Sequence, residues 1–123
     1  PPGAPLFLLI GRMFTFLAET LLPNDPSMIA YSVNLMSGVC TAFAATFAAW
    51  STITLGKLAL VGRSDEMTTA QTIVTLGAGL VAGLGTAFTS SVWFSAVEGE
   101  VYALSIFFMT FVVWAAIKWE ARP

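Results

Sequence analysis

The sequence predicts an all-α integral membrane protein, with three transmembrane helices preceded by an interfacial or juxtamembrane helix. Of its 123 residues, 57% are apolar and 10% are charged, whereas a soluble domain carries about 25% charged residues. The charges leave uncharged stretches of 31, 31 and 17 residues, at 26–56, 67–97 and 101–117. A 31-residue helix would be about 46 Å long, which exceeds the hydrocarbon core of a membrane at about 30 Å.

We predict transmembrane spans at 29–55, 69–94 and 99–118, with a loop at 56–68. The third uncharged stretch would reach only about 26 Å as a helix. It still suffices, because Lys118 can extend its ammonium to the interface and Trp119 can anchor there. No basic segment precedes a short apolar stretch, so none of the spans resembles a signal peptide. We expect residues 1–123 to be a single membrane-domain fragment of a longer protein.

The N-terminal segment 4–22 differs from the spans because polar residues interrupt it. Three of them recur at helical spacing and should share one face: Arg12, Thr15 and Glu19. A narrow polar stripe on an apolar helix indicates a helix at the membrane surface or against the bundle.

Turn-forming residues mark the expected helix ends. Asp25 is placed to cap the first span, and Pro26 suits its first position. In the 56–68 loop, Gly62 is a stop signal, and Ser64 and Asp65 are start signals for the next helix.

The basic residues predict the orientation. Four of the five belong to one side: Lys57, Arg63, Lys118 and Arg122. Arg12 alone lies on the other side. By the positive-inside rule, the 56–68 loop and the C-terminus are cytoplasmic, and residues 1–27 and 95–100 are extracytoplasmic.

Composition excludes several classes of function. The net charge of −2 leaves no basic surface for a phosphate backbone, so we expect no nucleic-acid partner. The single cysteine, Cys40, cannot form an internal disulfide, and the absence of histidine removes the usual zinc sites. A metal site would have to use carboxylates and a hard cation.

The acidic turn at Glu98 and Glu100 is the main candidate site, because carboxylates next to hydrocarbon are costly to desolvate. On one helix the two would point about 200° apart, so they could line one pocket only if Gly99 breaks the helix. Glu98 and Tyr102, four residues apart, could share a face. Alternatively, this is a hydrated turn whose acids help to start the next helix through its dipole.

Two features inside the spans concern packing. Gly79 and Gly83, extended by Gly77 and Gly85, form a stripe of small residues that lets another helix approach closely. The same glycines resemble a dinucleotide-binding loop, but they lie in an uncharged span that no strand precedes, so helix packing is favoured. Asn34 could bond across helices or point into a cavity, and the sequence does not choose between them.

Three stretches together resemble a known family. They are Pro1-Pro2-Gly3-Ala4-Pro5-Leu6 with Gly11-Arg12, then Val33-Asn34-Leu35, and Trp93-Phe94-Ser95-Ala96-Val97-Glu98-Gly99-Glu100-Val101-Tyr102-Ala103-Leu104. They are similar to the N-terminal part of a multi-pass membrane family, catalogued in bacteria as a domain of unknown function. Its eukaryotic relatives are transmembrane protein O-mannosyltransferases, of the GT-C class of glycosyltransferases. The resemblance implies a bacterial inner (cytoplasmic) membrane.

This resemblance implies transfer of a sugar from a polyprenyl-phosphate donor to an extracytoplasmic, protein acceptor. The family's acidic motif, with the principal catalytic base, would lie upstream of Pro1, so we expect this fragment alone to be inactive. Glu98 and Glu100 occupy the position of a second functional acid, which could bind a divalent cation or hold sugar hydroxyls. Arg12 could pair with the lipid phosphate, or instead contact Glu19 or extend to the interface. Asn34 and Tyr102 complete the candidate substrate-binding set.

A second hypothesis is a transporter or a structural membrane subunit without a catalytic role. A transporter should show discontinuous spans with polar residues at mid-membrane. Mid-span polarity is limited here to Ser and Thr, such as Thr41, Thr46, Thr75 and Thr86. Because these hydroxyls can bond to their own helix backbone, an ion pathway is disfavoured.

Overall fold

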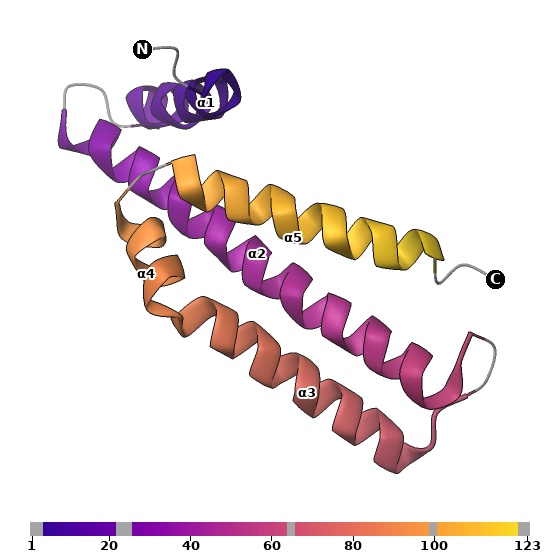
Figure 1. Ribbon diagram of the computed structural model, residues 1–123. Helices are drawn as coiled ribbons and strands as arrows, with labels where there is room; N and C mark the ends of the chain where they lie inside the picture. Colours follow the sequence, from indigo (N-terminus) through magenta and orange to yellow (C-terminus); the bar gives the residue numbers. More distant parts are fainter. Residues whose placement is uncertain (1–3, 22–25, 64–65, 99–100, 121–123) are drawn as a thin grey trace.

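The computed structural model describes residues 4–21, 26–63, 66–98 and 101–120. In this part of the chain every element is helical, in the order α1 (Pro5–Leu21), α2 (Ser27–Val61), α3 (Thr69–Phe88), α4 (Ser90–Val97) and α5 (Val101–Glu120) (Figure 1). Three of these helices, α2, α3 and α5, are long and apolar enough to cross a membrane. The predicted all-α fold with three spans is confirmed.

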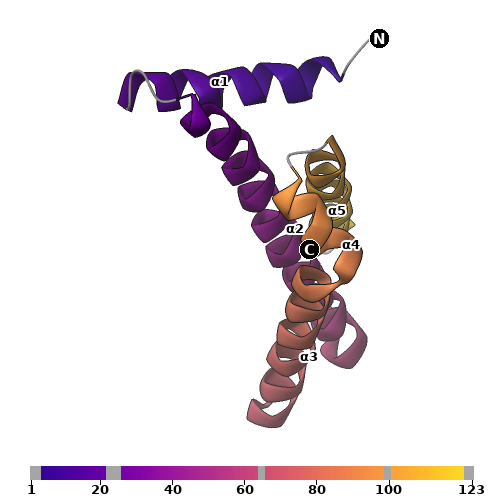
Figure 2. The ribbon, with the colours of Figure 1, turned by 90° about the vertical axis from the view of Figure 1, so that its left-hand side faces the viewer.

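Helix α1 lies across the N-terminal end of α2 (Figure 2), and beyond it α2 lies between α3 and α5 and packs against both (Figure 1). The buried residues of α1 are Gly11 and Thr15, whereas its large apolar side chains, such as Phe16, are exposed. Arg12, Thr15 and Glu19 all belong to this continuous helix, so their spacing places them on one face, on which Thr15 is buried and the two charged residues are exposed. Arg12 and Glu19 do lie together, because their side chains form an ion pair with an N–O distance of 3.3 Å.

Helix α2 is longer than the predicted span 29–55, because Lys57 does not end it. Gly62 ends it, as predicted: its φ of +76° favours glycine, and its N–H donates to the carbonyl oxygen of Leu58 at 3.1 Å. At the start, Pro26 is the N-cap rather than the first helical residue, and Asp25 lies outside the described residues. A 35-residue helix is about 52 Å long, so α2 must tilt or project beyond the hydrocarbon.

Helix α3 begins with a capping box that the sequence analysis missed. The Thr68 hydroxyl accepts from the N–H of Gln71, and the Gln71 side chain accepts from the N–H of Thr68. This reciprocal pair satisfies two donors that the first turn of a helix leaves free. Of the predicted start signals, Ser64 and Asp65 lie outside the described residues.

The predicted span 69–94 is two helices rather than one. Thr89 is extended, with φ −62° and ψ 131°, and separates α3 from α4. Its hydroxyl donates to the carbonyl oxygen of Gly85, one turn back. Thr75 and Thr86 make the same bond within the continuous helix α3, so this bond accompanies the break and does not cause it. Helix α3 alone is long and apolar enough to cross a membrane, so the break follows a segment of spanning length.

Helices α2 and α3 approach each other through small residues. A Cβ added at Gly79 would lie 2.8 Å from Ile53 Cδ1 and 3.1 Å from the carbonyl oxygen of Ala49. One added at Gly83 would lie 3.1 Å from the Ala49 Cβ. Ile53 and Ala49 of α2 can approach α3 this closely because Gly79 and Gly83 have no side chains. By contrast, nothing lies within 4 Å of a Cβ added at Gly77 or Gly85, so the proposed extension of the stripe is wrong.

Helices α2 and α5 are joined by aromatic rings. Members of this aromatic cluster are Phe43, Phe47, Trp50, Phe107, Phe111 and Trp114. Phe47 is central: its ring centroid lies 6.0 Å from Phe107, 5.3 Å from Phe111 and 5.1 Å from Trp114. Centroid distances of 4.5–7 Å are those of favourable aromatic pairs.

Replacing Phe47 by alanine should loosen α5 from α2. Three ring contacts are lost, and each aromatic pair contributes about 0.5–1.5 kcal/mol, so the free energy of unfolding should fall by about 2–4 kcal/mol. Phe108 is a matched control because its ring contact is with Phe107 on the same helix. Thermal unfolding in detergent, followed by circular dichroism, measures both variants; an equal loss for Phe108→Ala would contradict the role of this cluster.

The buried polar side chains are hydroxyls: Thr15, Ser32, Ser37, Thr41, Ser51 and Thr75. The prediction that mid-span hydroxyls bond to their own helix is confirmed for Thr41, Thr46, Thr75 and Thr86. These hydroxyls share the interior with Met36, Ala44, Val92, Ala103 and Leu104, and most large apolar side chains lie on the surface. This arrangement suits a helix bundle in lipid.

Candidate functional site

Glu98 lies at the C-terminal end of α4, exposed, at the turn between α4 and α5. Its backbone N–H donates to the carbonyl oxygen of Phe94 at 3.1 Å and closes the helix. Within the described chain its carboxylate has no hydrogen-bond or ion-pair partner. A carboxylate at a helix C-terminus faces the negative end of the dipole, so its place here does not stabilise α4.

The surroundings of Glu98 differ in part from the prediction. Helix α4 ends at Val97 and α5 begins at Val101, so the break that would allow two acids to line one pocket is present. Glu100 itself lies outside the described residues. Tyr102 is 66% exposed on the first turn of α5. Because Glu98 and Tyr102 belong to different helices, the i, i+4 relation does not place them on one face, and that prediction is wrong.

Arg12 and Asn34 belong to the same end of the molecule but to other surfaces. The Arg12 side chain is 69% exposed on α1 and is paired with Glu19, which was the alternative to a role in phosphate binding. Asn34 is exposed near the start of α2, with no hydrogen bond within the described residues. The cross-helix bond proposed for Asn34 is therefore not formed.

The described residues hold no group of three or more His, Cys, Asp or Glu side chains that could bind a metal ion. Cys40 is half-buried within α2. Glu98 thus supplies one carboxylate, and a divalent cation at this turn would need ligands from outside the described part of the chain. The same carboxylate can instead accept hydrogen bonds from hydroxyl groups without a metal.

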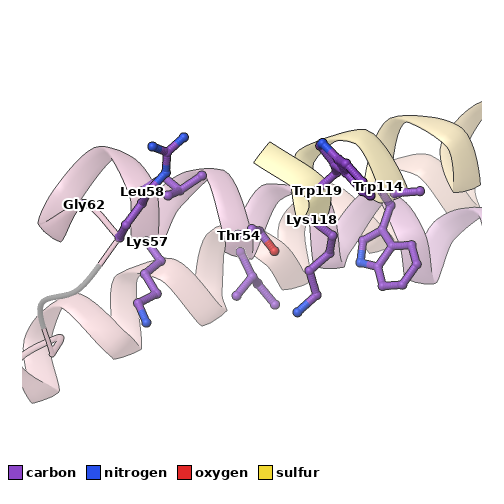
Figure 3. A pocket seen from close by; sticks show the side chains of 10 residues that line it. Thr54, Lys57, Leu58, Gly62, Trp114, Lys118 and Trp119 are labelled. Atoms are coloured by element: carbon purple, nitrogen blue, oxygen red, sulfur yellow. The ribbon is translucent and has the colours of Figure 1, made fainter. Parts of the chain in front are cut away.

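A groove of about 630 Å³ lies between the C-terminal ends of α2 and α5, where both helices carry lysine (Figure 3). Its lining includes Thr54, Lys57, Leu58, Trp114, Lys118 and Trp119. Lys57 and Lys118 were predicted to lie on the same side of the membrane, but their place in one groove was not predicted. The sequence held one indication of their proximity: each lysine lies close to the C-terminal end of a long apolar stretch.

Comparison with known proteins identifies the family. The family model described as "Protein O-mannosyl-transferase TMEM260 N-terminal domain" matches residues 1–123. The chain belongs to this family. No curated protein and no solved structure matches the chain. The resemblance to transmembrane protein O-mannosyltransferases is confirmed at the level of the family.

Proposed function

We propose that this chain is part of a GT-C-like membrane glycosyltransferase, which transfers a sugar from a polyprenyl-phosphate donor to an extracytoplasmic protein acceptor. The observation that carries the proposal is the match of all 123 residues to the N-terminal domain of a protein O-mannosyltransferase. In this proposal the principal base belongs to another part of the enzyme. Glu98 is a second acid that orients sugar or acceptor hydroxyls, together with Glu100.

The proposed orientation has Glu98 outside and the 56–68 loop inside. In its support, Lys57, Arg63 and Lys118 gather at one end of the bundle, where they line one groove. Arg12 is carried by α1, which packs on α2 at the other end. With this distribution the positive-inside rule gives a cytoplasmic groove. From the family resemblance we further propose that the membrane is the inner membrane of a bacterium. Helix α1, with its apolar side chains exposed, then lies at the outer interface.

A transporter remains the competing hypothesis, because one of its features, a discontinuous helix, is present at Thr89. In transporters such breaks lie near the middle of the membrane and expose backbone groups to a substrate. Here the break follows a 20-residue span. The mid-span hydroxyls of Thr75 and Thr86 are also engaged with their own backbone. The observations therefore favour the transferase.

The test is to compare glycans on exported proteins from cells with the intact gene, a deletion, and the deletion complemented with the gene. We expect one sugar modification to disappear in the deletion and to return on complementation. Mass spectrometry of exported glycopeptides measures it. If every glycan is unchanged in the deletion, the transferase proposal fails, and the transporter or structural hypothesis replaces it.

A further inference from the structure

The groove between α2 and α5 holds two lysines without counter-ions. Lys57 projects from α2 and Lys118 from α5, with their ammonium groups on the same side and Thr54 between them (Figure 3). Both are exposed, and neither has an acidic partner within the described chain. The third cation of the groove, Arg63, is engaged: it donates to the carbonyl oxygen of Glu120 at 2.8 Å and pairs with its carboxylate. Two positive charges therefore remain for a ligand.

Trp114 adds a third unused donor to the groove. Its indole N–H is buried and has no acceptor in the structure. Figure 3 shows the nitrogen edge of this ring on the side that faces Lys118. Three buried polar groups of the described chain lack a partner, the hydroxyls of Ser37 and Ser51 and this N–H. Of the three, only Trp114 belongs to the groove lining, so an acceptor bound in the groove could satisfy it. The ring itself is fixed by Phe47, at 5.1 Å, and Trp50, at 5.4 Å, between centroids.

We propose that this groove binds the phosphate headgroup of an anionic phospholipid. Phosphate oxygens accept hydrogen bonds from ammonium and indole donors and neutralise both lysines. The source is a lipid rather than a free phosphate because Leu58 and Trp119 give the groove apolar walls. Both lysines also lie near the ends of apolar spans, at the level where headgroups and tryptophan side chains meet. The groove is remote from Glu98, so this inference stands apart from the proposed transferase activity.

The test uses the whole protein in nanodiscs of equal parts phosphatidylglycerol and phosphatidylcholine, and native mass spectrometry to count the lipids that stay bound. We expect selective retention of phosphatidylglycerol. Each lysine near a headgroup should contribute about fivefold to binding, so the double variant Lys57→Gln, Lys118→Gln should lose most of the preference. The double variant Lys57→Arg, Lys118→Arg keeps both charges and should retain it.

Two further variants, which leave every charge in place, control for misfolding. Trp114→Phe keeps the ring and every charge but removes the N–H, and it should reduce retention of phosphatidylglycerol severalfold. Trp93→Phe, in α4, changes the same side chain outside the groove and should leave retention unchanged. Equal retention of both lipids, or an unaltered preference in Trp114→Phe and the double glutamine variant, would overturn the proposal. Displacement of phosphatidylglycerol by millimolar inorganic phosphate would show a site for soluble phosphate instead, and would also overturn it.

Discussion

Replacing Gly79 by leucine should separate α3 from α2 and lower the free energy of unfolding by about 3 kcal/mol or more. The position has no room for a side chain, because even a Cβ meets Ile53 and the carbonyl oxygen of Ala49. The added Cβ meets Cγ1 of Ile53 as well as its Cδ1, and a β-branched side chain is stiff about χ1, whereas the backbone oxygen of Ala49 moves only with its helix. The added atoms therefore force the helices apart, and forced overpacking costs about 1–3 kcal/mol even for small insertions.

A double-mutant cycle identifies the contact that is responsible. Gly79→Ala adds only the Cβ, and Ile53→Ala removes the side-chain atoms that this Cβ would meet. The two changes together should destabilise the protein by less than the sum of the separate effects, because the second change makes room for the first. Gly77→Ala and Gly85→Ala are matched controls, since a Cβ at either position contacts nothing. Thermal unfolding in detergent measures each variant; a large loss for these controls would mean that helix flexibility, not close packing, explains the glycines.

The number and approximate places of the spans could be predicted, because few charges can enter the hydrocarbon and long uncharged stretches are therefore visible in the sequence. Helix ends were harder. Lys57 continues α2 because a long side chain can reach water from within a helix, so charge alone does not mark an end. The break at Thr89 was not predicted because threonine also occurs within continuous helices, as Thr75 and Thr86 do in α3, so its presence does not mark a break.

The candidate site was predictable only in outline. The acidic turn between the last two helices was located from its residues, and a turn is found there. Its neighbours were not predictable, since Glu98 and Tyr102 were assumed to share a helix. The groove at the other end depends on two residues from separate helices, Lys57 and Lys118, which helix packing brings together. The spacing of residues within one helix does not show which residues of two separate helices will lie together.

Replacing Glu98 by glutamine should lower the proposed glycan transfer by about tenfold to a hundredfold. A hydrogen bond to a charged group contributes about 1.5–3 kcal/mol, and glutamine keeps the shape but loses the charge that strengthens it. The stability of the protein should not fall, because the carboxylate is exposed and faces the negative end of the α4 dipole. Occupancy of the glycan on exported proteins, measured at matched expression, gives the first quantity, and thermal unfolding gives the second.

The control is another exposed glutamate far from this turn. Glu66 precedes α3, at the opposite end of that helix from the α4 segment, and Glu66→Gln removes the same charge by the same substitution. It should leave the glycan unchanged. If Glu98→Gln loses the glycan at normal stability and Glu66→Gln keeps it, the Glu98 carboxylate takes part in the transfer itself. If both variants retain full transfer while a deletion abolishes it, the enzyme stands and Glu98 is a hydrated acid of the turn. The explanation for the acid would then be the next helix, because α5 begins at Val101 and the positive end of its dipole favours a carboxylate in the preceding turn.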